Sequence, residues 1–224
     1  MTYIHQRCVV NVASGHYVNG QRRLLNSSFL HADTLGYADQ FPPGSPTHAQ
    51  SSYAFKAHAL KAAAEKGYRL LLWADASVKP VRSLEPLWER IERDGYWIQA
   101  NDGWNNWQWT AQAAYDPLEI TEEENQKVTH VMAISFGIDL ESETGGLILD
   151  DYIRLAKSGA FNGHWKNDRL QAHPNPKVLG HRHDQTALSI IAHRLGCKMT
   201  AQPEPLAYLG RETPKTILIA DGNY

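Results

Sequence analysis

The stretch "YRLLLWADASVKP" (residues 68–80) decides the fold class of this chain. Its run RLLLWA (69–74) is typical of a central parallel strand that is buried on both faces of a sheet. The strand is followed at once by Asp75, Ala76 and Ser77. The stretch therefore predicts an α/β sheet that carries polar side chains where its central strand ends.

The segments around this strand alternate between strand and helix patterns. Strands are predicted at 8–13, 35–41 and 96–100, and helices at 21–30, 47–66 and 84–94. This alternation favours an open α/β sheet, in which ligands bind beyond the carboxyl ends of the strands. We therefore expect Ala13–Gly15 and Asp75–Ser77 to lie at the same rim.

The second half of the chain is less regular. A Trp- and Asn-rich loop is predicted at 101–110, a charged helix face at 121–125, a strand at 129–140, and helices at 146–157 and 185–195. The polar segment 159–180 is predicted to be a long loop, and such loops inside a compact domain are more often functional than idle. We expect one domain over residues 1–224.

The composition excludes several classes of protein. Of the 224 residues 42% are hydrophobic, which is enough for a core, and the net charge of −2 disfavours a protein that mainly grips bare nucleic acid. Two distant cysteines favour a reducing compartment over a disulfide scaffold. No apolar run approaches the ~20 residues that a membrane span needs. The expectation is a soluble, cytoplasmic protein that does not bind a membrane.

Asp75 and Ser77 are the first candidates for a functional site. In an extended chain, residues two apart point to the same side, and Mg²⁺ or Mn²⁺ prefers such oxygen ligands together with substrate phosphates. The alternative is that both side chains only cap the turn. Spacing alone leaves the two interpretations open.

The stretch "GHRHDQ" (180–185) holds the densest group of metal- and phosphate-competent side chains. His181 and His183, two residues apart, could both ligate a metal, and Arg182 could neutralise a phosphate. Asp184 directly precedes a predicted helix, so it could also be an N-cap. The clustering favours a functional site.

Two further features suggest ligand contacts. Lys56, on the helix before the Asp75 strand, could extend to an anionic ligand, although helical lysines are mostly solvated. Trp104, Trp107 and Trp109 could stack on a sugar or a nucleobase, or could pack on one another as a small core. His164 and Trp165 form a similar, smaller pair.

Together, "LLLWADAS", "YAFKAHALKAAAEKGY" and "GHRHDQTALSIIAHRLG" resemble nucleotide-sugar glycosyltransferases of the GT-A fold, including glycosyltransferase-like proteins of phages and bacteria. The resemblance implies a single Rossmann-like domain with a central, mostly parallel mixed sheet flanked by helices. It also implies a nucleotide-sugar half at about 1–100 and an acceptor half at about 101–224. The family's Asp-x-Asp metal motif reads Asp75-Ala76-Ser77 here, so its second carboxylate is missing.

The resemblance also implies roles for individual residues. Mn²⁺ or Mg²⁺ would be held by Asp75 and Ser77 with His181 or His183. Asp184 and Gln185 would orient the donor sugar, and Arg182 would stabilise the leaving diphosphate. The donor, expected to be a UDP-sugar, would contact eight residues: Ala13, Ser14, Gly15, His16, Lys56, Trp73, Ala74 and Asp75. The acceptor would lie against Trp104, Trp107, Trp109, His164 and Trp165.

The acceptor and the stereochemistry stay open at this point. The acceptor is either a glycan or small molecule, or a hydroxymethylated pyrimidine in phage DNA. Retention of anomeric configuration is favoured because no base carboxylate stands out. The alternatives outside this family are a non-catalytic glycan or nucleotide-sugar binding module and a metal-dependent hydrolase.

Overall fold

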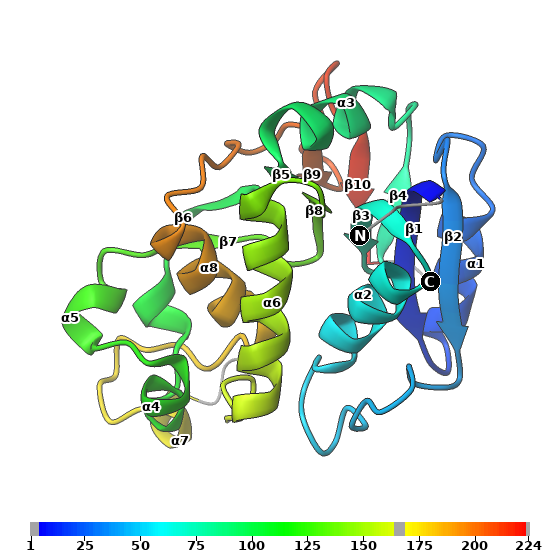
Figure 1. Ribbon diagram of the computed structural model, residues 1–224. Coiled ribbons are helices and arrows are strands. Elements are labelled where there is room, and N and C mark those ends of the chain that lie inside the picture. Colours follow the sequence, from blue (N-terminus) through cyan, green and yellow to red (C-terminus); the bar gives the residue numbers. More distant parts are fainter. Residues whose placement is uncertain (1–4, 164–168, 223–224) are drawn as a thin grey trace.

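The computed structural model describes residues 5–163 and 169–222 and is built on a five-stranded mixed sheet (Figure 1). Its order is β2 (Asp33–Ala38), β1 (His5–Ala13), β3 (Tyr68–Ala74), β8 (Ser135–Asp139), β5 (Tyr96–Trp97). The strands β2 and β3 run parallel to β1, whereas β8 is antiparallel to both β3 and β5. The predicted mixed α/β sheet is confirmed.

The central strand β3 is buried on both faces, as its apolar run predicted. Leu71 and Trp73 belong to a hydrophobic cluster with α2 (Phe55–Glu65) and α6 (Glu143–Ser158). Leu70 and Leu72 belong to a second cluster with α1 (Tyr17–Leu25) and α3 (Glu85–Asp94). Because successive side chains of a strand point to opposite faces, one short run supplies both cores. In Figure 1, α2 and α6 lie side by side over one face of the sheet.

Smaller elements surround this framework. A three-stranded sheet has the order β4 (Val78–Pro80), β10 (Leu218–Ala220), β9 (Leu206–Tyr208), and β6 (Ala100–Asn105) pairs with β7 (Thr129–Val131). The remaining helices are η1 (Asn106–Trp109), η2 (Gln112–Ala114), α4 (Tyr115–Leu118), α5 (Glu122–Asn125), α7 (Arg169–Ala172) and α8 (Asp184–Arg194). The helix α8 packs on α6 and β7, which places its first residues beside the main sheet.

Several predicted element boundaries were wrong. The helix predicted at 47–66 begins only at Phe55, because Tyr53 has a φ of 62°, which an α-helix cannot contain. The predicted loop 101–110 is instead β6 followed by η1, where the Asn105 side chain caps the new turn. The strand predicted at 129–140 is divided into β7 and β8, which belong to different sheets.

No helix in the described part of the chain is both long enough and apolar enough to cross a membrane.

The first turn of α6 provides a test of the packing that fixes this helix. A Cβ at Gly145 would lie 2.1 Å from the backbone oxygen of Asp139, whereas a Cβ at the adjacent Gly146 would meet nothing within 4 Å. We expect Gly145→Ala to lower the free energy of unfolding by about 1–3 kcal/mol, since overpacking against backbone cannot relax. Gly146→Ala should be neutral, or stabilising by up to about 1 kcal/mol.

Chemical denaturation of the two variants and the wild type measures this difference. Equal stability of the two variants would show that the first turn of α6 is not in close contact with the Asp139 backbone.

Candidate active site

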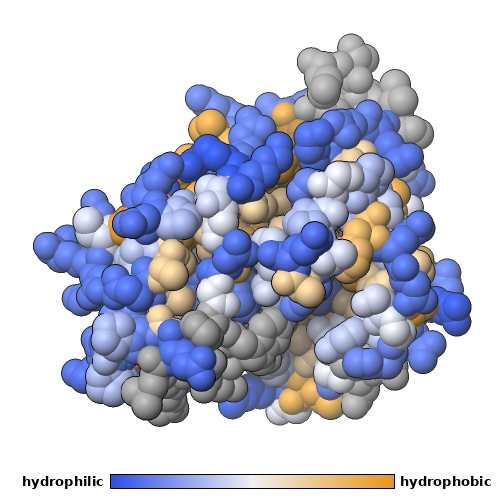
Figure 2. Space-filling view, turned by 90° about the horizontal axis from the view of Figure 1, so that it is seen from below, coloured by the Kyte–Doolittle hydropathy of each residue, from blue (hydrophilic) through white to orange (hydrophobic). Residues whose placement is uncertain are grey.

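A cavity of about 580 Å³ lies where β1 and β3 end. Its walls include Ala13 and Ser14 after β1, Asp75–Ser77 after β3, and residues 181–185 before and within α8. The prediction that the ends of β1 and β3 share one rim is therefore confirmed. Figure 2 shows the molecule from the edge of the sheet at which β2 ends. On this face, small patches of hydrophobic residues lie among hydrophilic ones.

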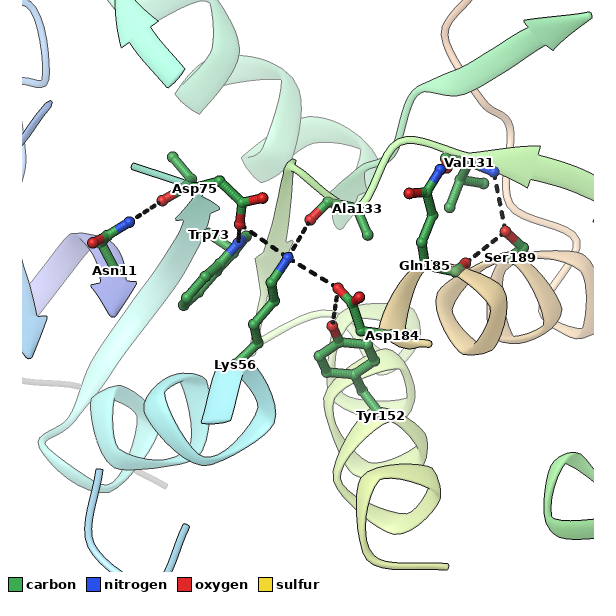
Figure 3. A network of polar contacts seen from close by, with 11 residues as sticks. Asn11, Lys56, Trp73, Asp75, Val131, Ala133, Tyr152, Asp184, Gln185 and Ser189 are labelled. Carbon is green, nitrogen blue, oxygen red and sulfur yellow. Dashed lines mark hydrogen bonds and ion pairs between the residues drawn. The ribbon is translucent and has the colours of Figure 1, made fainter. Parts of the chain in front are cut away.

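Lys56 lies at the centre of the polar contacts in this cavity (Figure 3). Its Nζ is 2.9 Å from Asp75 Oδ1 and 2.9 Å from Asp184 Oδ2, and it donates a hydrogen bond of 3.0 Å to the carbonyl of Ala133. The lysine comes from the first turn of α2, Asp75 from the end of β3, and Asp184 from the start of α8. One ammonium group thus connects α2 and β3, which are consecutive in the chain, with α8, which is distant in the sequence.

The surroundings of Lys56 keep it charged. Burial alone would lower the pKa of Lys56, but the carboxylates of Asp184 and Asp75 outweigh this effect and raise the pKa above its ordinary value. The ammonium also lies 5.2 Å from the ring centres of Tyr53 and Trp73, which is cation–π distance. The default of a solvated helical lysine does not hold here, since the side chain is only 3% exposed.

The two carboxylates are fixed by further hydrogen bonds. Trp73 Nε1 donates to Asp75 Oδ1 at 2.7 Å, and the Tyr152 hydroxyl on α6 donates to Asp184 Oδ2 at 3.3 Å. Burial raises the pKa of Asp75 and of Asp184, and Lys56 opposes this effect at both. Asp75 is still 24% exposed, so part of its carboxylate faces the cavity.

Gln185 follows Asp184 in the first turn of α8 and also lines the cavity. Its Nε2 donates to the carbonyl of Val131 at 2.6 Å. One turn further along α8 lies Ser189, whose hydroxyl accepts a hydrogen bond from the Val131 amide. The end of β7 is thereby tied to α8, which holds Asp184 and Gln185 in place.

The two histidines of "GHRHDQ" are held by backbone groups. His181 Nδ1 accepts from the Ala111 amide at 3.2 Å, and its Nε2 donates to the Ala160 carbonyl at 3.3 Å. His183 Nδ1 donates to the Phe161 carbonyl at 2.8 Å. Burial lowers the pKa of His181 to about 3 and that of His183 to about 4, so both rings are neutral near pH 7. His183 also has a φ of 51°, a strained value for a residue with a side chain.

Arg182, between these histidines, lies with its guanidinium 4.3 Å from the ring centre of Trp109 and lines the cavity. Burial lowers the pKa of Arg182, but a guanidinium stays protonated in proteins. Trp109 is buried and Trp104 meets it edge-on at 5.2 Å, whereas Trp107 is half-buried. None of these three tryptophans lines the cavity among the described residues, so Trp109 reaches it only through Arg182.

The other predicted donor residues lie behind or beside the cavity. Trp73 and Ala74 are buried beneath it, and the Ala74 carbonyl accepts from Asn11. The Gly15 amide donates to Asp39 at 2.7 Å, and His16 contacts the ring of Tyr17, which does line the cavity. His164 and Trp165 lie outside the described residues.

Sequence analysis missed an aromatic wall that lines the same cavity. It consists of Tyr17, Phe41, His48, Tyr53 and Phe55. All but Tyr17 come from residues 41–55, which the sequence analysis placed at the end of a predicted strand (35–41) and in a predicted helix (47–66). The prolines at 42, 43 and 46 and the serines at 51 and 52 were the signal for an irregular segment extending to the rim. Flat rings at this position suit stacking on a base or a sugar.

The predicted metal ligands do not fit a divalent ion in this arrangement. Among residues 5–163 and 169–222, no group of three or more His, Cys, Asp or Glu side chains could hold one. The Lys56 ammonium already lies between the two carboxylates, and both ring nitrogens of His181 are bonded to backbone. Of the four predicted metal ligands, Asp75 and Ser77 are the two that carry side-chain oxygen atoms, and both line the cavity.

Two solved structures overlap with nearly the whole chain. Mouse xyloside xylosyltransferase 1, in its apo form, has a TM-score of 0.51 at 10% sequence identity, covering 99% of this chain and 98% of its own. A glycosyltransferase involved in the glycosylation of the major capsid of PBCV-1 has a TM-score of 0.52 at 12% identity, covering 96% and 94%. The chain has the GT-A glycosyltransferase fold.

The GT-A fold predicted from the sequence is thus confirmed at the level of architecture. No protein-family model matches the chain, and no curated protein is similar to it in sequence. At 10–12% identity the similarity is one of fold, and the chemistry has to be argued from the cavity itself.

Lys56 can be tested through stability. We expect Lys56→Met to lower the free energy of unfolding by about 3–5 kcal/mol at pH 7, because it leaves two buried carboxylates without their cation. Lys61→Met is the matched control on the same helix, since Lys61 is 44% exposed and pairs with the exposed Glu65. Its effect should stay below about 1 kcal/mol.

The pH dependence gives a second readout of the same variant. Without Lys56, the positive charge that opposes the effect of burial at Asp75 and Asp184 is gone, so their pKa values rise further in the folded state. Protonation then relieves the repulsion, and the deficit of Lys56→Met should shrink as the pH falls from about 7 to 5. A deficit that matches Lys61→Met at every pH would contradict the central role of Lys56.

Proposed function

We propose that this protein is a glycosyltransferase that moves a sugar from a nucleoside-diphosphate sugar to an acceptor hydroxyl. One observation carries the proposal: a chain that overlaps almost end to end with two glycosyltransferases has a polar cavity at the strand ends, where open α/β sheets bind ligands. The cavity of about 580 Å³ is of a size that small-molecule sites commonly have.

The lining of the cavity supports a donor of this class. The aromatic wall and the small residues Ala13 and Ser14 suit a nucleoside, which can approach the backbone there. Arg182 suits a diphosphate, and Asp184 with Gln185 suits the hydroxyl groups of a sugar. A UDP-sugar is the donor that we test first.

The chemical step follows from these assignments. The bond between the anomeric carbon and the phosphate oxygen breaks, and its electron pair stays on the diphosphate. The acceptor oxygen bonds to the same carbon and its proton passes to the departing phosphate oxygen. Positive charge near that oxygen stabilises the transition state. Arg182 is the cavity residue that we propose for this role.

Retention of anomeric configuration is the stereochemistry that the cavity favours. Inversion needs a base that removes the acceptor proton, and a base has to be within hydrogen-bond reach of it. The only carboxylates that line the cavity among the described residues are Asp75 and Asp184, and both are paired with Lys56. Transfer of the proton to the leaving diphosphate requires no such base.

A glycan or a small glycoside is the proposed acceptor. The two similar structures are a xyloside xylosyltransferase and a glycosyltransferase involved in the glycosylation of a viral major capsid, and this supports a glycan or glycoside acceptor. Hydroxymethylated DNA is the competing acceptor. Trp104 is exposed and contacts Trp109, so it offers a surface on which either a sugar ring or a base could stack.

A donor panel tests the proposal. Purified protein is incubated with UDP-, GDP- and ADP-sugars, each with Mn²⁺, with Mg²⁺ and with a chelator, and thermal shift and nucleotide release are measured. We expect one nucleotide class to raise the melting temperature, because a ligand that binds only the folded state stabilises it. If no donor stabilises the protein or releases nucleotide under any of these conditions, the proposal fails.

The product of that reaction tests the acceptor and the stereochemistry. With the donor that binds, simple alkyl and aryl glycosides, plain DNA and hydroxymethylated DNA are offered in parallel. We expect transfer to a glycoside and, by proton NMR, the same anomeric configuration in product and donor. Transfer to hydroxymethylated DNA alone would exclude the glycan acceptor, and an inverted product would exclude the step written above.

A further inference from the structure

Resting on the proposed function, we infer that this protein binds its nucleotide-sugar donor without a divalent metal. Lys56 is the cation of the acid pair, and Arg182 takes the charge of the diphosphate. The starting observation is the position of the Lys56 ammonium, 2.9 Å from a carboxylate oxygen of Asp75 and 2.9 Å from one of Asp184. A cation already lies between the two acids of the cavity.

The acid pair has little capacity left for a second cation. Asp75 Oδ1 accepts from both Lys56 and Trp73, and Asp184 Oδ2 accepts from both Lys56 and Tyr152. A metal ion at this point would lie next to an ammonium group, and like charges so close together in a buried site repel each other strongly.

The remaining oxygen ligands are too few. Position 77 is a serine, whose neutral hydroxyl contributes no charge to a metal site. Both ring nitrogens of His181 are already hydrogen-bonded, one to the Ala111 amide and the other to the Ala160 carbonyl. Among the described residues that line the cavity, Asp75 is therefore the carboxylate that is exposed to it, since 24% of its side chain is exposed against 5% of that of Asp184.

Arg182 supplies the positive charge that a metal ion would otherwise place beside the diphosphate. Its guanidinium lies over Trp109 at 4.3 Å and lines the cavity, and within the described residues no carboxylate forms an ion pair with it. A guanidinium presents a planar set of N–H donors that matches two phosphate oxygens at once. Stacking on the indole fixes this plane and removes rotamer freedom before the ligand arrives.

Further positive charge lies behind Ser77. Arg23 and Lys79 each lie 3.2 Å from Asp221, whose amide donates to the Ser77 carbonyl at 3.1 Å. Arg23 Nη2 also donates to the Ala76 carbonyl at 3.4 Å. These groups place cations directly beneath the rim where the second carboxylate of the family's metal motif would lie, and they add to the attraction for an anionic donor.

Calorimetric titration tests this inference. UDP, GDP and ADP are titrated separately into the full-length protein, once with excess EDTA and once with Mn²⁺. We expect the nucleotide that binds to have about the same Kd in both buffers. In EDTA, Arg182→Gln should weaken binding about 10- to 100-fold, the loss expected for hydrogen bonds to a charged group.

Arg93→Gln is the matched control, because Arg93 is 66% exposed and pairs with Asp94 on α3. It should leave the Kd unchanged. Arg182→Lys keeps the charge but not the planar set of donors, and its loss should be smaller than that of Arg182→Gln. The comparison of wild type in the two buffers needs no variant, so it decides the matter even if Arg182→Gln does not fold.

The outcomes separate the two proposals. Nucleotide binding that appears only with Mn²⁺, or an unchanged Kd in Arg182→Gln, would overturn the inference and leave the glycosyltransferase function standing. If none of the three nucleotides binds in either buffer, the donor itself is wrong, and the proposed function falls together with the inference.

Discussion

The ion pairs of Lys56 with Asp75 and Asp184 are the interaction on which the site depends. A buried ammonium is stable only where carboxylates and dipoles replace the water that it has lost. Those groups are Asp75 at the end of β3, the Ala133 carbonyl between β7 and β8, and Asp184 at the start of α8. The lysine therefore fixes the relative positions of segments that are far apart in the sequence. The shape of the cavity depends on the contacts that these elements make with the Lys56 ammonium.

The main sheet makes this meeting possible. β3 is buried on both faces and ends at Asp75, and α2 runs directly before it, so Lys56 in the first turn of α2 lies at the same end of the sheet. The helix α6 packs beside α2 and contributes Tyr152, while α8 packs on α6 and contributes Asp184. The polar contacts thus follow from apolar packing that brings three helices to one rim.

The sequence predicted the parts of this arrangement that depend on short-range patterns. The run at 69–74 predicted a buried central strand, and its position relative to 8–13 predicted the shared rim. Tyr53 could not be placed, since its positive φ depends on contacts with His48 and His183 that only the folded chain forms. The partners of Lys56 lie 19 and 128 positions away, and nothing in the local pattern could distinguish it from a solvated lysine.

The charges that line the cavity explain why position 77 can be a serine where the family's Asp-x-Asp motif has a second carboxylate. Two cations, Lys56 and Arg182, face two carboxylates, Asp75 and Asp184, among the described residues that line it. A third carboxylate at this rim would make the cavity negative and would repel a diphosphate unless a metal ion offset it. A serine keeps the rim polar without that charge. The neutral side chain at 77 and the lysine between the acids are therefore two parts of one electrostatic arrangement, in which the protein supplies the cations itself.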